Sequence, residues 1–236
     1  MLLKAALNGN RSPDAHPALP TTPEELAADA AACVRAGAGA IHMHPRGADG
    51  RESLDAGVVD AAVRGVRAAV RVPVGVSTGA WIEPDPERRA ALVRTWREPD
   101  MASVNLSEAG AELVMVALLD AQIGVEAGVW SVEDAERLHA TGLADKVLRV
   151  LVEIVHPVAD PAAEARRIDA ALDDLGVRAP RLHHGEEGAT WPVLRQAVVL
   201  GLDTRIGFED TLLLPDGGTA PSNERLVRAA AELTQT

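Results

Sequence analysis

Two histidines separated by one residue, His42 and His44, carry the strongest chemical signal in the sequence. They end a short apolar run, Ala40–His44, which we expect to be a β-strand. Side chains alternate across a strand, so both imidazoles would lie on one face and Met43 on the other. Two imidazoles on the same side of a strand end can bind a single metal ion. The alternative interpretation places one histidine inward and the other on the surface.

A second group of ionisable residues accompanies the last expected strand, Thr204–Phe208, in which Arg205 lies and which Glu209 and Asp210 follow. In a closed barrel the eighth strand lies beside the first, and its end faces the end of the second strand across the mouth. Glu209 could then complete a set of two histidines and one carboxylate, which leaves an open coordination position. The alternatives are a solvated acidic pair that opens a loop and, for Arg205, a salt bridge at the bottom of the barrel.

Neutral polar residues end two further strands. Ser77, Thr78 and Gly79 end the third, where the hydroxyl groups could bind a carboxylate or merely cap the next turn. Ser103 and Asn105 share one face at the end of the fourth, where they could line a pocket as hydrogen-bonding groups.

The seventh expected strand ends in the neighbours His183 and His184. Neighbouring side chains on a strand point to opposite faces, so only one of the two can look inward. A second metal site here is therefore the less favoured interpretation.

Short apolar runs alternate eight times with longer stretches of helical periodicity, and these elements must position the residues above. The expected strands are Leu2–Asn8, Ala40–His44, Val72–Ser77, Met101–Leu106, Gln122–Val129, Val147–Val155, Arg181–His184 and Thr204–Phe208. The expected helices are Pro23–Ala38, Asp55–Val70, Asp85–Trp96, Gly110–Ala121, Val132–Thr141, Pro161–Leu175, Trp191–Leu200 and Ser222–Leu233. Such alternation predicts a parallel sheet, and eight units favour an α/β fold of the (β/α)8 TIM barrel type.

An open, doubly wound sheet is the alternative fold. It normally carries a glycine-rich phosphate-binding turn after the first strand, and the segment Asn8–Pro13 lacks that pattern. In a barrel, chemistry gathers where strands end and the following loops begin, and the residues singled out above all lie there.

Composition sets the outer bounds. The chain has 236 residues, which fits one barrel domain over residues 1–236, and its net charge is −12 with the charges scattered. A nucleic-acid-binding protein would need a basic stripe, so we expect no nucleic-acid partner. The sequence has no apolar run near 18 residues and no secretory leader pattern, which predicts a cytoplasmic protein without a membrane partner. The single cysteine, Cys33, cannot form an intramolecular disulfide.

Five segments together resemble the β-keto acid cleavage enzymes, the group that includes the 3-keto-5-aminohexanoate cleavage enzyme. In chain order they are Pro17–Glu25 (PALPTTPEE), Ala36–Arg46 (AGAGAIHMHPR), Ser77–Gly79 (STG), Met101–Ser103 (MAS) and Arg205–Asp210 (RIGFED). The later Ser222–Val227 (SNERLV) also fits the last helix of that family. The first, second and last of the five are specific when they occur together.

The resemblance implies a zinc-dependent barrel enzyme that exchanges a β-keto acid with acetyl-CoA, giving acetoacetate and a new acyl-CoA. His42, His44 and Glu209 would hold one Zn²⁺ per chain. Asp210 would be the general base, and Ser77 and Arg205 would orient it and the substrate. An aspartate beside a cationic arginine would stay ionised near neutral pH. The resemblance further suggests an assembly of several copies of the chain.

We expect Thr78, Gly79, Ser103 and Asn105 to bind substrate, together with Asn10. The last of these stands near the position where the family usually carries an acidic residue. The chain also departs from the family pattern after the fourth strand (Ser107–Ala109) and after the seventh (His183–Glu187). These departures touch the pocket walls and the contacts to CoA rather than the metal ligands.

Two other functions remain open at this point. The same metal could serve a CoA-independent hydrolase or retro-aldol lyase. A barrel that only binds a keto acid or a partner protein is a further alternative, although such a module has no need of a base beside a Lewis acid.

Overall fold

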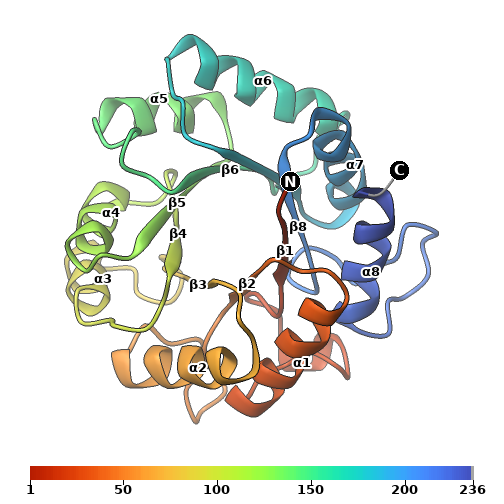
Figure 1. Cartoon of the computed structure of the whole chain (residues 1–236). Coiled ribbons are helices and arrows are strands. Elements are labelled where there is room, and N and C mark those ends of the chain that lie inside the picture. The colour runs from red at the N-terminus through yellow and green to blue at the C-terminus, as the bar shows by residue number, and fades with distance from the viewer. Residues whose placement is uncertain (235–236) are drawn as a thin grey trace.

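The computed structural model describes residues 1–234 and is a closed barrel of eight parallel strands that follow one another in chain order around the ring. The helices lie outside the ring, as Figure 1 shows. The strands are β1 Leu3–Ala6, β2 Ala40–Met43, β3 Val74–Ser77, β4 Met101–Asn105, β5 Gly124–Val129, β6 Arg149–Ile154, β7 Arg181–Gly185 and β8 Asp203–Ile206. The helices are α1 Pro23–Arg35, α2 Ala56–Ala69, α3 Pro86–Val93, α4 Ala111–Asp120, α5 Val132–Ala140, α6 Pro161–Asp174, α7 Thr190–Leu200 and α8 Asn223–Thr234. Two short 3₁₀ segments, Pro13–Ala15 and Glu187–Ala189, precede α1 and α7.

The predicted barrel is confirmed, and the open sheet is excluded because β1 pairs with β8 as well as with β2. All eight expected strands and all eight expected helices are present, with ends shifted by a few residues.

Two of the shifted strand ends lie where side chains replace strand pairing. We expected the first strand to continue to Asn8, but its side-chain amide bonds to the backbone of His44. We expected the eighth strand to include Phe208, whose backbone N–H donates instead to the Asn223 side chain.

Helix ends follow ordinary capping chemistry. The Thr22 hydroxyl accepts a hydrogen bond from the Glu25 backbone N–H, and the Glu25 carboxylate accepts one from the Thr22 N–H, which forms a capping box at the start of α1. The side chains of Asp55 and Asp85 likewise accept hydrogen bonds from backbone N–H groups in the first turns of α2 and α3. These caps fix where each loop at the mouth of the barrel gives way to a helix.

Strand register brings the ends of distant segments together. Ala6 lies opposite His42, and Ala5 lies opposite Ile206. The ends of β2 and β8 therefore flank the end of β1, where the predicted ligands lie.

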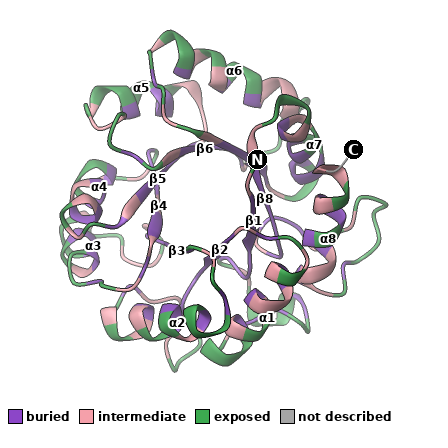
Figure 2. Ribbon diagram, in the orientation of Figure 1, coloured by how far each residue is buried: buried purple, intermediate pink, exposed green. Residues whose placement is uncertain are grey.

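The strands form a ring of mostly buried residues, drawn in purple in Figure 2, while the exposed (green) and intermediate (pink) residues of the helices face outward. Lys4 is fully buried inside the barrel, and its ammonium group donates to both carboxylate oxygens of Glu126 at 2.8 and 2.7 Å. Burial lowers the pKa of Lys4, and Glu126 opposes that shift. This buried ion pair between Lys4 and Glu126 is therefore a structural part of the barrel interior. Within residues 1–234 no helix is both long and apolar enough to span a lipid bilayer.

Candidate metal centre

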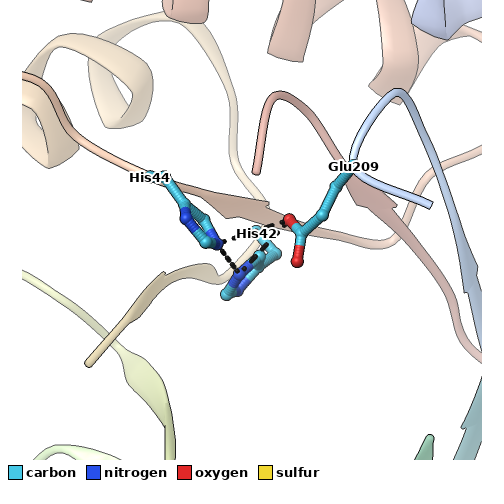
Figure 3. Close-up of side chains that lie close together, drawn as sticks. All are labelled: His42, His44 and Glu209. Carbon is cyan, nitrogen blue, oxygen red and sulfur yellow. Dashed lines mark hydrogen bonds and ion pairs between the residues drawn. The ribbon is translucent and has the colours of Figure 1, made fainter. Parts of the chain in front are cut away.

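Three predicted ligands converge at the carboxyl ends of β2 and β8. The Nε2 atoms of His42 and His44 lie 3.1 Å apart, and Glu209 Oε2 lies 3.5 Å from the first and 3.6 Å from the second. Figure 3 shows the two imidazoles and the carboxylate facing one another. Within residues 1–234 this is the one group of three or more histidine, cysteine or acidic side chains that could hold a metal ion.

The dimensions of this triangle fit a small divalent cation. Ligand bonds of about 2.0–2.1 Å at tetrahedral angles put ligand atoms about 3.3 Å apart, close to all three separations. The carboxylate oxygen Glu209 Oε2 is buried and has no hydrogen-bond partner in the described part of the chain, and the same holds for His42 Nδ1. A buried carboxylate oxygen without a partner is costly, and a cation would satisfy it.

The protonation states of the three groups differ. Burial lowers the pKa of His42 far below its ordinary value, although Glu209 opposes that shift. Burial also acts to lower the pKa of His44, but Glu209 and Glu52 together raise it to about 9. Burial would raise the pKa of Glu209, but Arg205 and the two histidines hold it well below its ordinary range. Without a metal ion, these three groups therefore carry one proton at neutral pH, on His44.

His44 lies just beyond β2, and two other side chains fix it. Its backbone N–H donates to Asn8 Oδ1 at 2.9 Å, and its carbonyl oxygen accepts from Asn8 Nδ2 at 3.0 Å. Its ring atom Nδ1 lies 2.5 Å from Glu52 Oε1. A carboxylate on the outer nitrogen sets the tautomer of a metal-binding imidazole and leaves Nε2 free for the ion.

Glu209 is positioned from two sides. The neighbouring Phe208 backbone N–H donates to Asn223 Oδ1 at 2.6 Å, and Asn223 Nδ2 donates to the Leu7 carbonyl oxygen at 2.8 Å. This buried asparagine thus joins the ends of β1 and β8. Gly9, with φ of 57°, packs against the Glu209 side chain, where a Cβ atom would lie 2.6 Å from Glu209 Cγ. A side chain at position 9 would push the carboxylate away from the histidines.

Arg205 and Asp210 form an ion pair beside the ligand triangle. Arg205 Nη2 donates to Asp210 Oδ1 at 2.7 Å and to Glu209 Oε1 at 2.8 Å, and both aspartate and arginine are buried. We expected the arginine to keep the aspartate ionised. Burial raises the pKa of Asp210 above its ordinary value, with Glu209 adding to the rise and Arg205 and His184 opposing it, and ionisation near neutral pH stays a prediction. A raised pKa suits a residue that must accept a proton.

The two neighbouring histidines on β7 point to opposite faces, as predicted. His183 Nε2 lies 2.9 Å from Asp169 Oδ2 on α6, outside the barrel. His184 points inward, with Nδ1 3.6 Å from Asp210 Oδ1 and Nε2 3.5 Å from Glu153 Oε2. The pair therefore belongs to no shared metal site, and His184 lies next to the candidate base.

The ligands open into a small pocket with a volume of about 50 Å³. Its lining residues are His42, His44, Ser77, Trp81, Ser103, Asn105, Trp130, Glu153, Glu186, Arg205 and Glu209. Three of the residues predicted to touch substrate or to orient the base therefore line it: Ser77 on β3, and Ser103 and Asn105 on β4. The roles assigned to these residues remain predictions.

The other three predicted substrate residues lie differently. Thr78 is buried and donates its hydroxyl to the Ser103 carbonyl oxygen at 2.7 Å. Gly79 donates its backbone N–H to Ser77 Oγ at 3.2 Å, the turn-capping contact foreseen as the alternative. Asn10 is exposed in the turn after β1. None of the three is among the residues that line the pocket, and a contact with substrate remains a prediction for each.

Four residues that line the pocket were not predicted from the sequence: Trp81, Trp130, Glu153 and Glu186. Glu52, which contacts His44, was not predicted either. Glu52 and Trp81 lie in loops, where periodicity carries no information about direction. Glu153 is an acidic residue within the apolar run of β6, and this position was the only signal in the sequence that could have identified it as a buried charge. Burial would raise its pKa, but His184 lowers it below the ordinary value. Burial and nearby Asp210 raise the pKa of Glu186 to about 8.

Two comparisons with known sequences find β-keto acid cleavage enzymes. A sequence model of the family described as beta-keto acid cleavage enzyme matches residues 1–236. The chain is 28% identical over 259 residues to a 3-keto-5-aminohexanoate cleavage enzyme of Fusobacterium nucleatum subsp. nucleatum, covering 99% of this chain and 92% of that one.

Solved structures share the fold. A ternary complex of ObcA with a C4-CoA adduct and oxalate superposes with a TM-score of 0.73 at 17% identity, covering 92% of this chain. The chain spans 63% of that protein. The 3-dehydroquinate dehydratase of Aquifex aeolicus superposes with a TM-score of 0.60 at 11% identity, covering 100% of this chain and 98% of that one. At these identities the structures establish the barrel architecture and no more.

Proposed function

The chain belongs to the β-keto acid cleavage enzyme family, and we propose that it is a zinc-dependent enzyme that exchanges a β-keto acid with acetyl-CoA. The products would be acetoacetate and a new acyl-CoA. His42, His44 and Glu209 would hold the zinc ion, Asp210 would be the general base, and Arg205 and Ser77 would orient base and substrate.

One observation carries the proposal: a triangle of two imidazoles and a carboxylate lies directly beside a buried arginine–aspartate pair. Glu209 joins the two parts, because Oε2 faces the histidines while Oε1 accepts from Arg205 Nη2 at 2.8 Å. Two histidines and one glutamate form a ligand set used by catalytic zinc sites. The ion, when bound, would act as a Lewis acid that stabilises negative charge on the keto and carboxylate oxygens.

The remaining chemistry belongs to the protein. Asp210 would take a proton from carbon 2 of the β-keto acid, the carbon between the keto and carboxylate groups. Arg205, which lies 2.7 Å from Asp210, would keep the carboxylate in place and offset its charge. Ser103 and Asn105, on the opposite side of the pocket, would offer hydrogen bonds that fix the substrate.

The overall exchange is balanced in atoms and electrons. Carbon 2 forms a bond to the acetyl carbonyl carbon of acetyl-CoA, and the CoA thiolate leaves. The thiolate then attacks the original keto carbon, and the bond from that carbon to carbon 2 breaks. The two-carbon carboxylate unit departs with the acetyl group as acetoacetate, and the rest of the keto acid leaves as acyl-CoA. The proton taken from carbon 2 returns to it.

A turnover screen on metal-loaded protein tests this function. Candidate β-keto acids are incubated with and without acetyl-CoA, and acetoacetate and acyl-CoA are quantified. The proposal predicts that both products appear together and only when acetyl-CoA is present. Cleavage without CoA would favour a hydrolase or retro-aldol lyase on the same site. Thermal stabilisation by keto acids without turnover of any would favour a binding module.

A further inference from the structure

An exposed tryptophan forms part of the wall of the metal pocket. Trp81 lies in the loop after β3, and 48% of its surface is exposed, yet it lines the same pocket as the candidate ligands. Its ring is stacked on that of His44, with centroids 6.1 Å apart and planes inclined by 18°. The indole is therefore stacked on the ring of the candidate ligand His44 while nearly half of its surface is open to solvent.

Glu52 holds this tryptophan and His44 at the same time. Its Oε2 accepts a hydrogen bond from Trp81 Nε1 at 3.0 Å, and its Oε1 lies 2.5 Å from His44 Nδ1. The carboxylate belongs to the loop after β2, which doubles back through an antiparallel bridge between Arg46 and Glu52. Loops from two neighbouring strands thus meet above the ligand.

The backbone under the indole suits this position. Gly79 has no side chain, and a Cβ atom there would lie 2.4 Å from ring atoms of Trp81. The next backbone N–H, that of Ala80, donates to Glu108 Oε2 at 3.0 Å, and Glu108 Oε1 accepts from Asn105 Nδ2 at 2.9 Å. The loop is therefore tied to the end of β4 on one side and to Glu52 on the other.

The pocket under this cover is small. Its volume of about 50 Å³ is far below the roughly 300–1,000 Å³ of sites that enclose a drug-sized ligand. It has room for the chelating end of a β-keto acid and little more. A bulky group next to the keto carbon would meet the surrounding walls.

We propose that Trp81, held in place by Glu52, is a specificity-determining residue that restricts the metal pocket to β-keto acids whose chain is unbranched within two atoms of the keto carbon. This inference rests on the proposed function for its substrate class. Trp81 would touch the substrate, whereas Glu52 is a positioning residue that acts through Trp81 and His44. A rigid wall that excludes one or more methyl groups discriminates by about 10- to 200-fold.

The test uses two stable analogues on the zinc-loaded chain of residues 1–236, so that it does not depend on turnover. N-methylmalonamate and N-tert-butylmalonamate offer the same carboxylate and carbonyl oxygens and the same N–H beside the carbonyl. They differ in branching at the second atom from the carbonyl carbon. Calorimetry on the unsubstituted protein should show at least tenfold tighter binding of the methyl compound. In Trp81→Ala this ratio should fall to about twofold, mainly because the tert-butyl compound binds more tightly.

Matched variants separate the parts of the cover. Trp81→Phe keeps a ring over His44 but removes the hydrogen bond to Glu52, so its discrimination should lie between that of the parent and that of Trp81→Ala. Glu52→Ala should lose discrimination and also weaken zinc binding about tenfold, because it releases both Trp81 and His44. Val199→Ala, on the outer surface of α7 where the side chain is 84% exposed, should change neither quantity.

Three results would overturn the inference: a wild-type protein that binds both analogues equally, a Trp81→Ala variant that keeps tenfold discrimination, or one whose zinc affinity falls with its ligand affinity. The last would make Trp81 a support for His44 rather than a selector. Discrimination without turnover of any β-keto acid would instead sink the proposed reaction and leave Trp81 as the selector of ligand shape. Failure to bind zinc would overturn both.

Discussion

The side-chain amide of Asn8 makes two hydrogen bonds with the backbone of His44, accepting from its N–H at 2.9 Å and donating to its carbonyl oxygen at 3.0 Å. The amide thereby continues the pairing of β1 and β2 one step beyond the point where β1 ends. The residue that this pairing holds is a candidate metal ligand, so the end of the first strand determines where the imidazole lies.

Replacing Asn8 should therefore weaken metal binding. Asn8→Ala leaves the buried backbone groups of His44 unpaired, and we expect zinc affinity to fall about tenfold or more. The folded protein should also lose about 1–3 kcal/mol of unfolding free energy. Competition with a chromogenic chelator measures the first and urea unfolding the second. Asn8→Asp keeps the acceptor and loses the donor, so its zinc affinity should lie between that of the parent and that of Asn8→Ala. An unchanged zinc affinity in Asn8→Ala would contradict this role of Asn8.

Metal binding should release a proton from His44. The pKa of His44 is about 9 in the metal-free protein, so the ring is cationic at neutral pH and its Nε2 must lose a proton before it can coordinate. The pKa values of His42 and Glu209 lie well below their ordinary values, so neither contributes a proton. Zinc affinity should therefore rise about tenfold per pH unit between pH 6 and 8. A flat dependence in that range would show that His44 is already neutral.

Asp210→Asn should separate binding from catalysis. The amide keeps the shape of the side chain and a hydrogen-bond acceptor for Arg205 but cannot accept a proton. We expect metal content to stay near that of the unsubstituted protein and turnover with acetyl-CoA to fall by about 10²- to 10⁴-fold. Elemental analysis and a coupled acyl-CoA assay measure the two. Turnover within a factor of a few of the parent would place the base elsewhere.

Asp29 should make the protein less stable as the pH rises from 4 to 6. Burial raises its pKa to about 6, although a hydrogen bond from Asn223 opposes the shift. The unfolded chain loses this proton near pH 3.8, so between the two values the folded state holds more protons, and stability falls with increasing pH. The loss is at most about 3 kcal/mol.

Asp29→Asn keeps an acceptor for Asn223 and removes the titration. Urea unfolding of parent and variant at pH 4 and pH 7 isolates the effect of this one residue. The variant should gain stability relative to the parent at pH 7 only. An equal difference between the two proteins at both pH values would show that Asp29 ionises normally.

The barrel and its ligand triangle followed from local pattern plus one topological rule. Alternation along Ala40–His44 put both imidazoles on one face, and closure of the sheet brought Glu209 to them from the other end of the chain. Neither step needed knowledge of the loops. The same alternation correctly predicted that His183 and His184 point to opposite faces, since one ring faces Asp169 and the other faces the barrel interior.

What could not be predicted depends on loop conformation and burial. Glu52 and Trp81 reach His44 only because two loops fold back over the mouth, and hydrophobic periodicity carries no information about such turns. The upward shift of the Asp210 pKa was also not predicted, because it arises from complete burial, which only the folded structure reveals.

Zinc binding by the parent protein and by the His42→Ala variant tests directly whether His42, His44 and Glu209 form a metal site. Protein prepared without metal is titrated with zinc, and bound metal is measured after dialysis. We expect one tightly bound ion per chain in the parent, and loss of both tight binding and turnover in the variant. A parent that retains no zinc, or a His42→Ala protein that binds zinc and turns over like the parent, would contradict it.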